Sequence, residues 1–136
     1  MDHVSISRRA EIMRAVRSKH TAPEVCVRKA AHRLGLRFRL HAKYLPGTPD
    51  LVLPKWKTVI FVNGCFWHRH VDCKKTTTPI TNVPFWEEKF SRNVERDANN
   101  YRKLTELGWR VVVIWQCTVP TLEKAEAVLL QYFANE

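Results

Sequence analysis

Two short runs of β-branched and aromatic residues constrain the fold of this chain most. Lys57–Val62 (KTVIFV) and Arg110–Trp115 (RVVVIW) carry apolar side chains at consecutive positions. Strands formed from such runs are apolar on both faces, and strands of that kind lie inside a sheet whose two faces are covered. The two runs therefore predict an α/β fold with a mixed central sheet flanked by helices.

The rest of the chain supplies the covering helices and two shorter strands. Apolar residues recur at helical spacing in four segments, which are residues 7–19, 21–34, 84–107 and 122–133. The second of these opens with Thr21 and Glu24 in a capping-box pattern. Short strands are predicted at residues 37–41 and 51–53, whereas residues 63–83 show no period and are predicted to form a long irregular loop.

The length of 136 residues suits one domain, and neither an internal repeat nor a linker divides it. We therefore expect a single domain over residues 1–136, with residues 1–20 forming a basic helical arm. No run approaches the roughly 20 apolar residues of a membrane span, and the N-terminus lacks the apolar region of a signal peptide. These features predict a cytoplasmic protein without a membrane partner, and we expect a monomer.

Positive charge is concentrated at the N-terminal end. The chain has 23 Lys and Arg against 13 Asp and Glu, a net charge of +10, and residues 1–43 hold 11 of the basic residues but only 3 of the acidic ones. Arg14 and Arg17 lie in this block. Such a block predicts a polyanionic partner, most simply nucleic acid; the alternative is a merely soluble basic surface.

Three cysteines and a histidine have ligand chemistry that suits zinc. Cys65, His70 and Cys73 form a C-x4-H-x2-C pattern, and Cys117 follows the second apolar strand. Three thiolates and one imidazole complete a tetrahedral structural zinc site, which would brace the long loop against the sheet. The alternative is buried inert cysteines beside a surface histidine. Cys26 is predicted to be a core residue.

Asp50 is the first candidate for catalysis. It ends the turn-rich PGTPD segment just before a strand, where a simple turn aspartate is the common explanation. A Pro-Asp followed by a hairpin and a central strand also matches the first half of the PD-(D/E)xK metal-nuclease pattern. The carboxylate and lysine of the second half are missing from Phe61–Gly64. A nuclease of this kind would hold Mg²⁺ on Asp50 and backbone carbonyls, with another residue activating water.

His68 is the candidate for activating water. It lies just after the first central strand, and Asp97, on the expected apolar face of the long helix between Val94 and Tyr101, could orient its ring. The alternatives are a zinc-binding or surface His68, and an Asp97 satisfied by Arg96 or a backbone amide. Glu24 is ambiguous, because the capping box already explains it.

Aromatic residues form a third group. Phe66 and Trp67 lie in the loop that zinc would brace, and Trp86 lies at the start of the long helix, near Lys74 and Lys75. Aromatics near basic residues can wedge between base pairs. Core packing is the default explanation for each of them.

Four segments together resemble the very short patch repair (Vsr) endonucleases. They are PGTPDLVL, VIFVNGCFWHRH, FWEEKFSRNVERD and LGWRVVVIWQC, and the resemblance extends over roughly Arg9 to Cys117. It implies a restriction-endonuclease-like core with a structural zinc site. It also implies an enzyme that uses Mg²⁺ to nick duplex DNA on the 5′ side of the thymine in T:G mismatches left by deamination of 5-methylcytosine.

The resemblance assigns roles residue by residue. It implies that Asp50 binds the metal, that His68 is the general base, that Asp97 orients it and that Glu24 is an active-site acid. Val62 resembles a position whose backbone carbonyl binds Mg²⁺, and Asn63 stands where a histidine near the scissile phosphate can occur.

The resemblance also implies the residues that contact DNA and zinc. The aromatic wedge would be Phe66, Trp67 and Trp86, and the zinc ligands would be Cys65, His70, Cys73 and Cys117.

Two rival functions differ in substrate range or in catalysis. One is a mismatch endonuclease of broader specificity, and the other is a zinc-stabilised DNA-binding module that has lost catalysis. The presence of Asp50, His68 and Asp97 argues against the second. The expected partner is double-stranded DNA with a T:G mismatch, mismatch-repair proteins are further candidates, and a bacterial enzyme of this kind would associate with the nucleoid.

Overall fold

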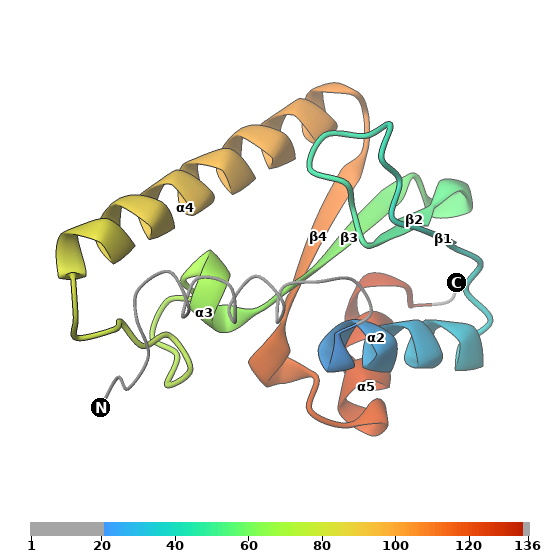
Figure 1. Ribbon diagram of the computed structural model, residues 1–136. Coiled ribbons are helices and arrows are strands. Elements are labelled where there is room, and N and C mark those ends of the chain that lie inside the picture. The colour runs from blue at the N-terminus through green and yellow to red at the C-terminus, as the bar shows by residue number, and fades with distance from the viewer. Residues whose placement is uncertain (1–20, 135–136) are drawn as a thin grey trace.

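The computed structural model describes residues 21–134 (Figure 1). Its centre is a four-stranded sheet in the order β1-β2-β3-β4. The first three strands are antiparallel neighbours, and β4 is parallel to β3. Their bounds are β1 Arg39–Leu40, β2 Leu51–Leu53, β3 Thr58–Asn63 and β4 Arg110–Trp115. The predicted mixed α/β fold is confirmed.

Helices cover both faces of the sheet (Figure 1). Helices α2 (Ala22–Arg33) and α5 (Leu122–Tyr132) pack together on one face, and α4 (Val83–Glu106) lies across the other. The short elements are α3 (Cys65–His68) and two 3₁₀ turns, Pro54–Trp56 and Gln116–Thr118.

Side chains alternate between the two covered faces. Ile60 and Val112 belong to the core under α2 and α5, whereas Val59 and Phe61 belong to the core under α4. Thr58 to Phe61 are all buried. The consecutive apolar positions are thus explained by a sheet covered on both sides.

The structure corrects three local predictions. The strand predicted at residues 37–41 shrinks to Arg39–Leu40, both exposed at the sheet edge. The loop predicted at residues 63–83 begins with α3. Val94 does not lie on the apolar face of α4, because its side chain is 45% exposed and Asn93 is buried in its place.

The prediction of a capping box at the start of α2 is also wrong. Thr21 occupies the N-cap position, but its side chain accepts no capping hydrogen bond. Glu24 is only 3% exposed and bonds to His41. The capping box does not form because the Glu24 side chain bonds to His41, 17 residues away, instead.

The basic arm predicted at residues 1–20, with Arg14 and Arg17, lies outside the described residues. Within residues 21–134, no helix is long and apolar enough to cross a membrane.

Candidate active site and metal centre

The site residues gather where β3 and β4 end. Because these strands are parallel, their carboxyl ends meet at one edge of the sheet. Cys65 and His68 belong to α3, directly after β3, and Cys117 follows β4. Strand β2 is antiparallel to β3, so Asp50, just before β2, reaches the same edge.

Asp50 is fixed by hydrogen bonds to β3. Its backbone N–H donates to the Ile60 carbonyl at 3.0 Å, and its Oδ2 accepts from the Val62 N–H at 2.7 Å. The preceding turn needs Gly47, which has φ +77° and lies so close to α4 that a Cβ would come 3.1 Å from Asn100. The turn thus sets the position of the carboxylate.

Burial controls the acidity of Asp50. Desolvation raises its pKa to about 6, and the nearby Glu24 carboxylate adds to this rise. The Val62 N–H, His41 and His68 act in the opposite direction. A partly buried carboxylate with few compensating positive charges is well suited to hold a cation.

Glu24 and His41 complete an acidic cluster beside Asp50. The Glu24 Oε2 lies 2.7 Å from the His41 Nε2 and 3.9 Å from the Arg28 guanidinium. One ligand atom each of Glu24, His41 and Asp50 lies within 4.8 Å of the others. His41 was not predicted as a site residue. It stands at the end of a short predicted strand, and that position indicates nothing about a contact with a residue 17 positions away.

His68 and Asp97 form the expected pair. The His68 Nδ1 lies 2.5 Å from the Asp97 Oδ2, joining α3 to α4. Arg96 instead bonds Asn93, so it does not explain Asp97. With Nδ1–H donated to the carboxylate, the Nε2 of a neutral ring is left to accept a proton.

Asn63 and Tyr101 lie beside this pair. The Asn63 Nδ2 donates to the Tyr101 hydroxyl at 2.8 Å, and Asn63 is only 4% exposed. Burial raises the pKa of Tyr101 to about 12, and the charges of Asp97 and Asp50 add to the rise. Tyr101 therefore stays protonated and places a neutral hydroxyl near the carboxylates.

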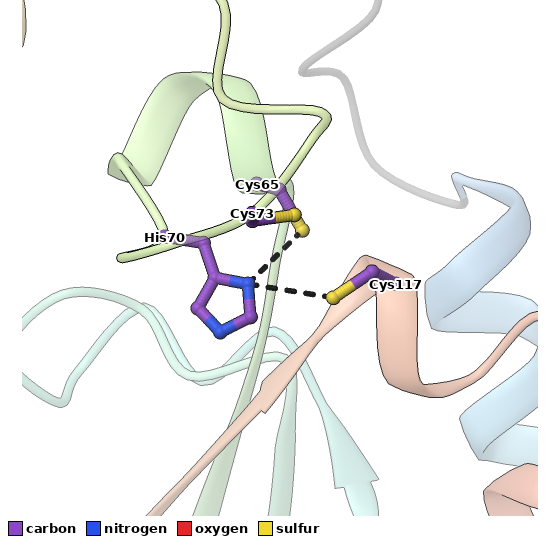
Figure 2. Close-up of side chains that lie close together, drawn as sticks. All are labelled: Cys65, His70, Cys73 and Cys117. Carbon is purple, nitrogen blue, oxygen red and sulfur yellow. Dashed lines mark hydrogen bonds between the residues drawn. The ribbon is translucent and has the colours of Figure 1, made fainter.

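The four predicted zinc ligands come together. Ligand atoms of Cys65, His70, Cys73 and Cys117 all lie within 4.8 Å of one another (Figure 2). The His70 Nδ1 lies 3.6 Å from the Cys65 Sγ and 3.4 Å from the Cys117 Sγ. Zinc bonds of about 2.3 Å to sulfur and 2.0 Å to nitrogen, at tetrahedral angles, separate such atoms by about 3.5 Å. The donor set and its spacing fit zinc, and His68 is not part of it.

Neighbouring groups hold these ligands in place. The His70 ring stacks on Trp115 with centroids 4.3 Å apart and planes 11° from parallel. The Thr76 hydroxyl donates to the His70 carbonyl at 2.7 Å. The backbone N–H of Lys75 lowers the pKa of Cys73 to about 6, whereas burial raises that of Cys65 to about 12. A cation would favour the thiolate form of each cysteine.

The three aromatics pack into one cluster with Phe90. Trp67 and Trp86 are 4% and 0% exposed, and Phe66 is half-buried against them. The Arg69 guanidinium lies 4.0 Å from the Phe90 ring centroid and donates to the Thr77 carbonyl at 2.7 Å. In this conformation the two indoles are core residues, so wedging into DNA would require the cluster to open.

Comparison with known proteins identifies the family. A sequence profile described as "DNA mismatch endonuclease Vsr" matches residues 1–75, more than half of the chain. The chain belongs to the Vsr family. As a Vsr-family protein it is an endodeoxyribonuclease, a DNA mismatch nicking endonuclease.

Curated relatives agree with this assignment. The chain is 46% identical over 128 residues to "Type II nicking enzyme V.XorIIP" of Xanthomonas oryzae pv. oryzae, covering 94% of this chain and 93% of the relative. It is 42% identical over 116 residues to "DNA mismatch endonuclease Vsr" of Escherichia coli K12, covering 85% and 74%. It is 44% identical over 116 residues to "Type II nicking enzyme V.NmeAIP" of Neisseria meningitidis, covering 85% and 82%.

Proposed function

We propose that this Vsr-family enzyme uses Mg²⁺ to nick duplex DNA 5′ of the thymine in T:G mismatches that arise from deamination of 5-methylcytosine. The observation that carries the proposal is the meeting of a partly buried carboxylate, Asp50, with a His68–Asp97 pair at one edge of the sheet. The family membership and the nicking enzymes among the relatives support the reaction.

Asp50 would bind the Mg²⁺ with one carboxylate oxygen, helped by the Val62 carbonyl and the Glu24 carboxylate. The ion would supply a positive charge to stabilise the negative charge that develops on the phosphate. The Val62 N–H, donating to the Asp50 Oδ2, fixes the carboxylate in place. The proposed ligand role of Val62 is independent of its side chain.

His68 would take a proton from the attacking water at Nε2. Asp97 accepts the Nδ1–H, which sets the tautomer and stabilises the imidazolium that forms. Asn63 would act nearby as a neutral phosphate contact, held by the Tyr101 hydroxyl. Its amide would offer a hydrogen bond rather than a charge.

The remaining roles concern DNA and zinc. Phe66, Trp67 and Trp86 would wedge beside the mismatch after their cluster opens, and Arg14 and Arg17 would contact phosphates. Zinc on Cys65, His70, Cys73 and Cys117 would brace the loop that carries the wedge.

The proposal also covers the domain organisation, oligomeric state, partners and location of the enzyme. The whole chain would act as one domain and as a monomer on double-stranded DNA, with mismatch-repair proteins as candidate partners. A DNA substrate in bacterial relatives supports a cytoplasmic, nucleoid-associated location.

The decisive experiment is a nicking assay on matched duplexes and on duplexes with each mismatch, with Mg²⁺ or EDTA. We expect Mg²⁺-dependent nicking 5′ of the thymine in T:G duplexes only. Asp50→Asn should abolish nicking and retain mismatch binding, because it removes a ligand charge without changing bulk. Nicking of several mismatches would indicate the broader enzyme, and binding without nicking by the wild type would indicate the non-catalytic module.

A further inference from the structure

His41 lies in the candidate active site, and the proposed function assigns it no role. It follows β1, and its backbone N–H donates to the Asp50 carbonyl at 3.1 Å. Its Nε2 lies 2.7 Å from the Glu24 Oε2, which comes from α2. Three separate segments thus converge on one point, and His41 contacts both of the acidic residues there.

The backbone of His41 is held in a rarely used conformation. Its φ is +47°, in the left-handed region that few residues other than Gly, Asn, Asp and His adopt. Strained residues of this kind concentrate at ligand-binding sites, where surrounding contacts keep them in place. Here the hydrogen bond to Asp50 and the contact with Glu24 do so, and they keep the ring within the cluster.

The spacing of the three side chains suits a six-coordinate cation. Bonds of about 2.1 Å place adjacent ligand atoms about 3 Å apart and opposite ones about 4.2 Å apart. The ligand atoms of Glu24, His41 and Asp50 all lie within 4.8 Å of one another, and the Glu24–His41 distance of 2.7 Å is close to that of an adjacent pair. Small side-chain rotations would let all three reach one ion.

The chemistry of the donor atoms determines which ion the site prefers to bind. Mg²⁺ favours oxygen ligands, whereas imidazole nitrogen increases affinity for first-row transition metals. We propose that His41 Nε2 is a direct ligand of the cation bound by Asp50 and Glu24, which makes this a mixed nitrogen and oxygen centre that prefers Mn²⁺ to Mg²⁺. The inference rests on the proposed role of Asp50 as a metal ligand and adds a ligand and a selectivity to it.

The first test compares metal affinities in the zinc-loaded full chain. His41→Gln can still donate a hydrogen bond to Glu24 but lacks an imidazole. We expect it to weaken Mn²⁺ binding by at least about tenfold, measured by titration of the free-ion EPR signal, and to change Mg²⁺ affinity, measured by calorimetry, less than about threefold. Equal losses for both ions, or no loss for Mn²⁺, would overturn the proposal.

The second test detects the nitrogen directly. Electron spin echo modulation of bound Mn²⁺ should show coupling to an imidazole ¹⁴N in the wild type and in the control His68→Gln, and none in His41→Gln. Coupling that persists in His41→Gln would exclude the ligand. His41→Asn, which tolerates the left-handed backbone, replaces His41→Gln if thermal melting shows that the glutamine variant is unfolded.

Asp50→Asn separates this inference from the proposed function. It should abolish binding of both cations. If Mn²⁺ binds Asp50→Asn as it binds the wild type, the catalytic metal site itself is misassigned. If binding depends on Asp50 but no nitrogen coupling is found in the wild type, only the role of His41 fails.

Discussion

Asp50 is a weaker acid in the folded protein than in the unfolded chain. Burial raises its pKa from 3.8 to about 6. The folded state therefore holds the proton more tightly, and the stabilisation this provides is complete below about pH 4 and is lost as the pH rises through 6. Above that pH, the ionised carboxylate lowers the free energy of unfolding by up to about 3 kcal/mol.

Asp50→Asn should therefore stabilise the protein when no Mg²⁺ or Mn²⁺ is added. We expect the free energy of unfolding to rise by about 1–3 kcal/mol at pH 7.5, and by roughly half as much at pH 5. Urea unfolding at the two pH values, with zinc retained and EDTA omitted, measures this. Adding Mg²⁺ should reduce the difference, because only the wild type gains from binding. A less stable variant at both pH values would contradict the argument.

His68 and Asp97 should behave as one catalytic unit. His68→Ala should lower the single-turnover rate by about 10²–10⁴-fold, the usual effect of removing a general base. Asp97→Asn should keep part of the rate, and the double variant should be little worse than His68→Ala. Zinc content measured on the same preparations is the control. Zinc loss in His68→Ala, or additive effects in the double variant, would place the base elsewhere.

Single residues show how far the sequence predicts this site. Asp50, His68 and Asp97 could be proposed as site residues because each stands at a recognisable position, after a turn, after a central strand or on a helix face. Glu24 was ambiguous and His41 was missed. Their contact joins residues 17 positions apart, and no periodicity or capping pattern records such a pairing.

The secondary structure was predictable where burial repeats along the chain. Strand β4 has the predicted bounds, and β3 begins and ends one residue later than predicted. Both strands were predictable because their side chains are packed on both faces of the sheet. Strand β1 has two exposed residues, so its pattern contained little information. The packing of Trp67 and Trp86 depends on how α3 meets α4, which local sequence does not encode.

The zinc ligands should determine the order of the segment that follows β3. Cys117→Ser removes a ligand that joins this segment to the end of β4. We expect loss of about one equivalent of zinc per chain, a lower melting temperature, and faster amide exchange across residues 63–83. Cys26→Ser is the matched control, since Cys26 packs against the core away from the cluster. Purified wild-type protein without zinc would refute the assignment.

The free energy of DNA binding should divide between attraction of charges and base stacking. A net charge of +10 predicts strong attraction to any duplex, with a steep dependence on salt. Selection of a mismatch needs contacts that depend on base stacking, which phosphate contacts do not supply.

Trp67→Ala should weaken mismatch binding more than it alters the salt dependence, because stacking is lost and phosphate contacts remain. Substituting Arg14 and Arg17 should mainly flatten the slope of log affinity against log salt. Binding of matched and T:G duplexes across a salt series measures both. Since Trp67 is buried, folding of the variant is checked first by thermal melting. Equal effects of both changes on slope and on discrimination would refute this division.

The parallel pairing of β3 with β4 also has a consequence for how the chain folds. Thr58 and Arg110, joined by a side-chain hydrogen bond, are 52 residues apart. Closing so large a loop costs entropy before its contacts form, so this pairing should limit the folding rate. We expect Cys65 and Cys117 to approach each other only after this pairing has formed. If zinc binds at that late stage, we expect it to slow unfolding and leave the folding rate almost unchanged, so that the bound metal would set the lifetime of the native state.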